Sequence, residues 1–306
     1  MKIAAAGGTL SIVVILVAIW LWTPDKERKA LESIYAQSPT DFVVVLGSRI
    51  HVRDTGPRDA PAIVMLHGFG ASLHTWDAWA TALSDRYRVI RYDLPGAGLT
   101  GADPGGDYTD ARGAEILIAL LDHFRIPHAT LVGHSMGGRL AWRFAAEHDA
   151  RVDKLVLIAP DGFASADGEY GKTPEVSAVL KLLPYIFPRL AARQSLQPAY
   201  ANPDMLTDEL LTRYYELILA PDVRKAMIAK LEQSVLSDPV PLLKRIAAPT
   251  LLIWGDQDAM IPIANAKDYL MALPAATLIT MTGSGHLPHE EAFEKSLVAL
   301  KEFLDK

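Results

Sequence analysis

The chain has 306 residues, a formal net charge of −6 and no cysteine. The missing cysteine excludes a thiol nucleophile, a cysteine-based zinc site and a disulfide framework. No cluster of lysine and arginine that would neutralise phosphate groups is present, so no nucleic-acid partner is expected.

The first predicted element is an apolar segment at residues 3–24. No charged residue lies between Lys2 and Asp25, and about 20 apolar residues are enough to span a bilayer. Trp20 and Trp22 stand at its C-terminal end, where aromatic rings favour the headgroup region. A cleaved signal peptide is the alternative, but no small-x-small site follows the run. We expect a single-pass N-terminal membrane anchor, and the flanking charges leave open whether the bulk of the chain is cytoplasmic or exported.

Short β-branched runs alternate with amphipathic helical stretches from residue 41 onward. Residues 25–40, which precede them, are polar and predict a juxtamembrane linker or helix. The expected strands are Phe42–Leu46, Ile50–Arg53, Ala62–Leu66, Tyr87–Tyr92, Ala129–Val132, Lys154–Ile158, Thr250–Trp254 and Thr277–Met281. Several are continuously apolar, as in strands that are buried on both faces of a parallel sheet. The alternation predicts an α/β fold with a mostly parallel sheet, and the first two strands, too close for a crossover helix, predict an antiparallel edge.

This alternation is interrupted at residues 161–248, where prolines are frequent and helical patterns appear at Leu206–Ala220 and Asp222–Leu236. Because the strand pattern then resumes, we expect a helical insertion between two strands of one sheet. The core domain is accordingly expected in two parts, residues 41–160 and 249–306.

The expected nucleophile lies in Gly133-His134-Ser135-Met136-Gly137, between a predicted strand and a predicted helix over Met136–His148. A serine on such a sharp turn needs small residues two positions to either side, because the backbones pass closely there. The turn directs the Ser135 hydroxyl outward at the carboxyl end of the sheet. The helix N-terminus behind it favours developing negative charge.

A serine nucleophile needs a base, and the base needs an orienting group. His286 follows the last predicted strand and Asp258 follows the strand before it, so both side chains are expected at the same sheet edge as Ser135. The chain order Ser, Asp, His fits this architecture. Asp258 is the expected acid, with Asp256, which can cap the turn, and Asp161 as alternatives.

The segment His67-Gly68-Phe69-Gly70 closes the third predicted strand, where a loop with oxyanion donors belongs. We expect the backbone N–H groups of Phe69 and Met136 to form the oxyanion hole, and His67 to hold the loop. The histidines are scattered and no dinucleotide-binding loop is present, so neither a metal nor a cofactor is expected.

In combination these motifs resemble the α/β-hydrolase superfamily. They are His67-Gly68-Phe69-Gly70, Asp93-Leu94-Pro95-Gly96, Gly133-His134-Ser135-Met136-Gly137-Gly138, Gly255-Asp256-Gln257-Asp258 and Gly285-His286. The resemblance covers roughly residues 42–304 and implies an eight-stranded sheet flanked by helices, with residues 161–248 as a helical cap over the active site. One departure is Pro95-Gly96-Ala97-Gly98, where the family usually has Pro-Gly-His-Gly; we expect it to alter loop packing more than chemistry.

Within the superfamily the sequence is most similar to capped serine esterases, monoacylglycerol lipases and C–C bond (meta-cleavage product) hydrolases, and the expected anchor favours monoacylglycerol-lipase-like members. The leading hypothesis is a serine hydrolase that cleaves carboxylic esters of apolar or lipid-like substrates through an acyl-enzyme on Ser135. Candidate pocket residues of the insertion are Tyr185, Phe187, Tyr200, Met205, Tyr214 and Tyr215.

Two alternatives remain open. A C–C bond hydrolase would use the same triad and would need a cationic clamp, for which Arg189 and Arg193 are candidates. A non-catalytic ligand sensor on the same fold is the second alternative. The sequence leaves acyl chain length, head group and oligomeric state open.

Overall fold

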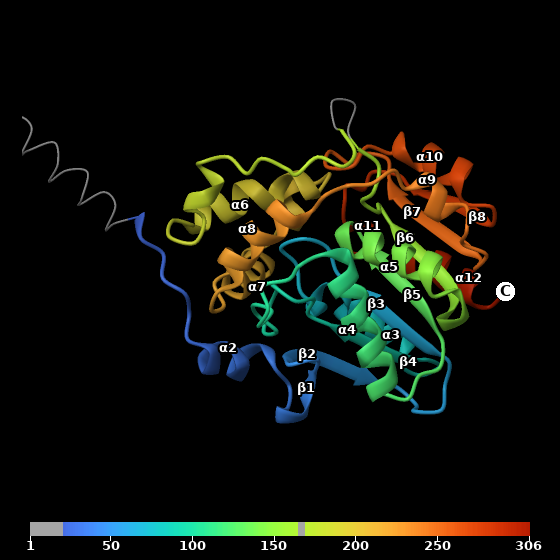
Figure 1. Cartoon of the computed structure of the whole chain (residues 1–306), viewed down its shortest axis with the longest axis horizontal. Coiled ribbons are helices and arrows are strands. Elements are labelled where there is room, and N and C mark those ends of the chain that lie inside the picture. The colour runs from blue at the N-terminus through green and yellow to red at the C-terminus, as the bar shows by residue number, and fades with distance from the viewer. Residues whose placement is uncertain (1–20, 165–168) are drawn as a thin grey trace, which may run out of the picture.

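The computed structural model describes residues 21–164 and 169–306. Within these residues the centre of the molecule is an eight-stranded sheet (Figure 1). Its strands are β1 (Phe42–Val45), β2 (Ser48–Thr55), β3 (Ala62–Leu66), β4 (Arg88–Tyr92), β5 (Ala129–His134), β6 (Val152–Ile158), β7 (Thr250–Gly255) and β8 (Ala276–Met281).

The strand order is β1-β2-β4-β3-β5-β6-β7-β8. β2 runs antiparallel to both β1 and β4, and every later pairing is parallel. The predicted α/β fold, with a mostly parallel sheet and an antiparallel edge, is therefore confirmed. Because β3 to β8 run in one direction, their carboxyl ends deliver the following loops to a single edge of the sheet.

Helices cover both faces of this sheet and also fill the segment between β6 and β7. The α-helices are α2 (Arg28–Tyr35), α3 (Asp77–Leu83), α4 (Asp110–His123), α5 (Met136–Glu147), α6 (Arg189–Leu196), α7 (Asp208–Ile218), α8 (Val223–Gln233), α9 (Val240–Leu243), α10 (Asn265–Ala272), α11 (Pro288–Glu291) and α12 (Phe293–Leu304). The 3₁₀ helices are η1 (Pro39–Asp41), η2 (Leu73–Trp76), η3 (Asp149–Arg151), η4 (Leu180–Leu182), η5 (Gln197–Ala199) and η6 (Pro203–Met205).

The continuously apolar strands are buried on both faces, as β3 illustrates. Ile63 and Met65 pack in one core cluster with side chains of α3 and α12. Val64 and Leu66, which point to the other face, pack with α4, α5, α9 and α10. This two-sided burial explains why the strand sequence lacks the polar alternation of a half-exposed strand.

The helices between β6 and β7 have a small core of their own. It joins apolar side chains of α6, α7 and α8 to Leu31 of α2, so α2 packs on this segment. In Figure 1, α6, α7 and α8 lie beside the sheet, on the side where the described chain begins. The predicted domain bounds, and the role of this segment as a cap, remain predictions.

The predicted membrane anchor at residues 3–24 falls almost entirely on residues 1–20, outside the described part of the chain. Among the helices of residues 21–164 and 169–306, none has the length and apolar character needed to cross a bilayer. The structure therefore does not confirm the anchor, which stays a prediction.

Candidate active site

Ser135 lies at the turn between β5 and α5, as the motif predicts. Its φ of 52° and ψ of −120° put a residue with a side chain in a strained backbone region. The turn depends on two close backbone approaches. A Cβ atom on Gly133 would lie 2.4 Å from the carbonyl oxygen of Gly137, and one on Gly137 would lie 2.4 Å from that of Leu66. The glycines therefore allow α5 to start directly against β3 and β5.

Asp258 and His286 are hydrogen-bonded to each other. Asp258 Oδ2 lies 2.8 Å from His286 Nδ1, and Asp258 Oδ1 accepts the backbone N–H groups of Met260 at 2.8 Å and Ile261 at 2.9 Å. Asp258 is buried, so these partners replace water around its carboxylate. Both carboxylate oxygens are fixed, and the imidazole is oriented with Nε2 free for a proton transfer.

The two alternative acids have other partners. Asp256 Oδ1 accepts the backbone N–H of Gly283 at 2.8 Å, which is the turn-capping role considered for it. Asp161 forms an ion pair with Arg139 at 2.8 Å. Of the three aspartates, Asp258 is the one that the structure brings to His286.

Hydrogen bonds made by two backbone groups of His286 hold the loop that carries it. The His286 N–H donates to the carbonyl of Ala199 at 2.7 Å, and its carbonyl lies 2.9 Å from Nε2 of His134. Burial lowers the pKa of His134 well below the usual value, so His134 is neutral and its Nε2–H is the donor. Sequence reasoning gave His134 no role, although it stands inside the nucleophile motif.

The predicted oxyanion loop runs beside Ser135. A Cβ atom on Gly68 would lie 3.2 Å from the Cβ of Ser135. His67 holds this loop, because its Nε2 accepts the N–H of Leu94 at 3.0 Å and its Nδ1–H donates to the carbonyl of Gly68 at 2.8 Å. Burial lowers the pKa of His67 to about 4, in keeping with a neutral structural ring. The oxyanion roles of Phe69 and Met136 remain predictions.

Ser135 and His286 open into a cavity of about 310 Å³ between the sheet edge and the helical segment. In the described chain these two side chains line the cavity without a hydrogen bond to each other, which is common in empty active sites. The apolar lining residues are Phe69, Ala71, Leu180, Leu183, Phe187, Leu196, Ala199, Tyr214, Ile218, Met227, Leu231, Met260 and Leu287. Among the described residues, no Lys, Arg, Asp or Glu lines this cavity.

This arrangement of strand order, serine turn and Asp–His pair agrees with the comparisons with known proteins. Residues 61–293 match the family model of the alpha/beta hydrolase fold. The chain belongs to this α/β-hydrolase family.

Three relatives illustrate the range of the family around this α/β hydrolase. The chain is 35% identical over 248 residues to the magnesium-chelatase 30 kDa subunit of Rhodobacter capsulatus, covering 79% of this chain and 86% of that protein. It is 30% identical over 258 residues to the 2-hydroxy-6-oxo-6-phenylhexa-2,4-dienoate hydrolase of Burkholderia cepacia, covering 81% and 89%. The crystal structure of a bacterial membrane phospholipase A is 25% identical, with a TM-score of 0.75, covering 100% of this chain and 98% of that one.

Two candidate groups of the hydrolase lie elsewhere than the sequence suggests. Arg189 contacts Thr212 at 2.8 Å and Arg193 contacts Asp208, and neither arginine is among the described residues that line the cavity. Of the six apolar and aromatic candidates from the insertion, Phe187 and Tyr214 line it. These two arginines therefore do not form the cationic clamp that the C–C hydrolase alternative would need.

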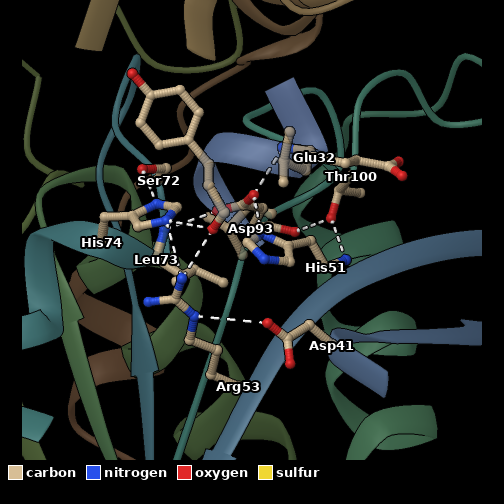
Figure 2. A network of polar contacts seen from close by, with 12 residues as sticks. Glu32, Asp41, His51, Arg53, Ser72, Leu73, His74, Asp93 and Thr100 are labelled. Atoms are coloured by element: carbon tan, nitrogen blue, oxygen red, sulfur yellow. Dashed lines mark hydrogen bonds and ion pairs between the residues drawn. The ribbon is translucent and has the colours of Figure 1, made fainter. Parts of the chain in front are cut away.

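A buried network around Asp93 joins the loops that flank the site (Figure 2). The Asp93 carboxylate accepts the N–H groups of Leu73 at 2.7 Å and Leu99 at 2.8 Å, and it pairs with Nδ1 of His51 at 2.7 Å. Burial opposes its ionisation, but His51 and neighbouring histidines outweigh burial and hold the Asp93 pKa below the usual value. Sequence reasoning missed this role, although Asp93 directly follows the predicted strand Tyr87–Tyr92.

A second acid, Glu290, joins the helical segment to the core. It accepts the hydroxyls of Tyr200 at 2.7 Å, Tyr214 at 3.0 Å and Thr75 at 2.5 Å. Burial is the main cause of the raised pKa of both tyrosines, so they remain protonated donors. This contact links three distant parts of the sequence, and no sequence pattern pointed to it.

Proposed function

We propose that the protein is a serine hydrolase that cleaves carboxylic esters of apolar or lipid-like substrates. The observation that carries this proposal is the apolar cavity, which is lined by Ser135 and His286 and by no charged side chain among the described residues. An acyl chain would gain roughly 25 cal/mol per Å² of apolar surface buried there, whereas a carboxylate would lose its hydration without a partner.

The proposed reaction proceeds through an acyl-enzyme. Ser135 Oγ attacks the ester carbonyl carbon while His286 Nε2 takes its proton, and Asp258 stabilises the resulting imidazolium. His286 then passes the proton to the departing alcohol. A water molecule, activated by the same histidine, attacks the acyl carbon and releases the acid and Ser135. The N–H groups of Phe69 and Met136 stabilise the oxyanion in both halves, a contribution of about 100- to 1000-fold per donor.

Membrane location forms part of this proposal. The apolar run at residues 3–24 is long enough to hold the enzyme in a bilayer, on a side that the flanking charges leave open. The similarity to a membrane phospholipase A over the whole chain supports a lipid-like substrate. Residues 161–248 would act as a cap that shapes the acyl site.

A C–C bond hydrolase is the second candidate, and the similarity to a dienoate hydrolase favours it. It would use the same serine, histidine and aspartate. A dienoate substrate carries a carboxylate, however, and no Lys or Arg of the described chain lines the cavity to bind it. This absence is the reason that ester cleavage is preferred. A ligand sensor is a third reading, which predicts binding without turnover.

The Ser135→Ala variant tests the catalytic assignment. We expect hydrolysis of short p-nitrophenyl esters to fall to background and fluorophosphonate labelling to be lost, because both need the Ser135 hydroxyl. Ser195, which also lines the cavity, provides the matched control, and Ser195→Ala is expected to keep the label. Undiminished turnover in Ser135→Ala would reject the nucleophile, and labelling without turnover in the wild type would favour the sensor.

A further inference from the structure

Five exposed apolar side chains gather where the described chain begins and where the helical segment turns at η4. They are Trp22, Val179, Leu180, Leu182 and Tyr185, each between 46% and 78% exposed. Four of them fall within residues 179–185, and the Trp22 ring lies 5.8 Å from the Tyr185 ring, centroid to centroid. We call this set the apolar patch. A cluster of large apolar side chains in water marks an interaction site more often than chance exposure does.

The patch is fixed to the start of the described chain by hydrogen bonds. The Thr23 N–H donates to the carbonyl of Tyr185 at 2.9 Å, and the Thr23 hydroxyl accepts the N–H of Phe187 at 3.1 Å. Two residues further, Asp25 pairs with Arg224 of α8 at 2.7 Å. The described chain therefore begins beside the patch, and the uncharged run of the sequence, which extends to Pro24, ends there.

The same patch borders the mouth of the catalytic cavity. Leu180 belongs to the patch and also lines the cavity, together with Phe69 and Met260. All three side chains are exposed, so an apolar surface continues from the outside of the molecule to the space in front of Ser135. A substrate that enters along this surface would not have to expose its acyl chain to water.

We propose that the apolar patch docks on the surface of a lipid bilayer, with the mouth of the cavity facing the lipid. The occupant is a bilayer because an uncharged run from residue 3 onward ends at the patch, and a run of about 20 apolar residues matches a membrane span. Trp22 and Tyr185 add rings of the kind that favour the headgroup level. The proposal deepens the proposed function and rests on it for the membrane location and for the identity of the substrate.

The absence of cysteine allows docking to be measured at single sites. Val179→Cys places a fluorophore on the patch, and Met271→Cys on α10 is the matched control, since the two native side chains are 78% and 76% exposed. In Figure 1, α10 lies at the right and the start of the described chain at the left. The full chain is reconstituted in phosphatidylcholine vesicles with and without brominated acyl chains.

We expect the fluorophore at position 179 to shift to shorter wavelength and to lose emission in brominated vesicles, while that at position 271 does neither. Equal emission at the two sites, with no loss at 179, would overturn the proposal. A shift at 179 that follows protein concentration and is independent of brominated lipid would assign the patch to a second copy of the chain and would also overturn it.

Turnover separates this proposal from the proposed function. We expect a double variant, Val179→Asp with Leu182→Asp, to hydrolyse monoacylglycerol in vesicles roughly tenfold more slowly, because charged groups are costly in the apolar layer. Turnover of a short soluble ester by this double variant is expected to stay unchanged. The control variant Met271→Asp is expected to keep its turnover of both substrates. If no ester is cleaved at all, the proposed function fails while the fluorescence still reports docking. Equal vesicle turnover in the double variant and in Met271→Asp would count against docking alone.

Discussion

The edge of the sheet and the helical segment between β6 and β7 are built in different ways. At the sheet edge, Ser135, Asp258 and His286 lie in the turns and loops that follow β5, β7 and β8, and hydrogen bonds from backbone N–H groups fix these loops. Side-chain contacts, such as those of Glu290 with Tyr200 and Tyr214, join the helical segment to the core. The triad side chains thus come from loops at the sheet edge, whereas most of the apolar lining comes from the helical segment, which contacts the His286 loop through the carbonyl of Ala199.

The largest expected effect comes from replacing Asp258, the acid of the predicted triad. Asp258→Asn removes the negative charge that stabilises the imidazolium, and the Asn amide favours the wrong histidine tautomer. We expect kcat for a short ester to fall by about 10⁴-fold, as in serine enzymes with the same change. Asp256→Asn, which alters a turn-capping side chain two residues away, is expected to keep nearly full activity. Similar losses in the two variants would contradict the assignment of Asp258.

A smaller effect is expected from loosening the helical segment. Glu290→Gln gives the hydroxyls of Tyr200, Tyr214 and Thr75 a poorer acceptor, at a cost of about 1–3 kcal/mol in the free energy of unfolding. We expect KM for a medium-chain ester to rise several-fold while kcat for a short ester changes little. The exposed Glu294 provides the control variant Glu294→Gln. If kcat for the short ester fell by as large a factor as KM for the medium-chain ester rose, the helical segment and the sheet edge would not act separately, and this prediction would be contradicted.

The last expected effect concerns stability rather than turnover: a pH dependence of stability at the sheet edge. Burial lowers the pKa of His67 and His289 to about 4, while the unfolded chain binds these protons near pH 6.5. The unfolded state therefore holds more protons between these values, and stability is lost as the pH falls from about 6.5 to about 4. The loss is on the order of a few kcal/mol per histidine. Urea unfolding measured between pH 6.5 and pH 4 should show a smaller loss of the free energy of unfolding for His289→Asn than for the wild type. Equal dependence on pH in the two proteins would contradict this account.

The sequence predicted the sheet edge well because its signals are local. Several strands carry a continuous apolar run, and in a parallel sheet the residues that follow the strands lie at one known edge. This reasoning predicts that Ser135, Asp258 and His286 lie at that edge. It also identified the helices at Leu206–Ala220 and Asp222–Leu236, which the structure has as α7 and α8.

The packing of the helical segment could not be predicted in the same way. The Glu290–Tyr200 contact joins residues that are 90 positions apart, and no periodicity relates two such positions. Helix α6 was not predicted, because it is a stretch of only eight residues between Pro188 and Pro198. The arginines at 189 and 193 were clamp candidates by residue type alone, and their true partners depend on how α6 packs on α7.

The central claim is that an uncharged apolar cavity in front of Ser135 selects an ester with an acyl chain. The direct measurement is kcat/KM of the wild-type full chain for a medium-chain ester, compared with that for a carboxylate-bearing dienoate of the C–C hydrolase type. Our account predicts that the ester is preferred by about 100-fold or more, since the carboxylate would be buried without a partner. Faster turnover of the dienoate than of any ester would contradict it.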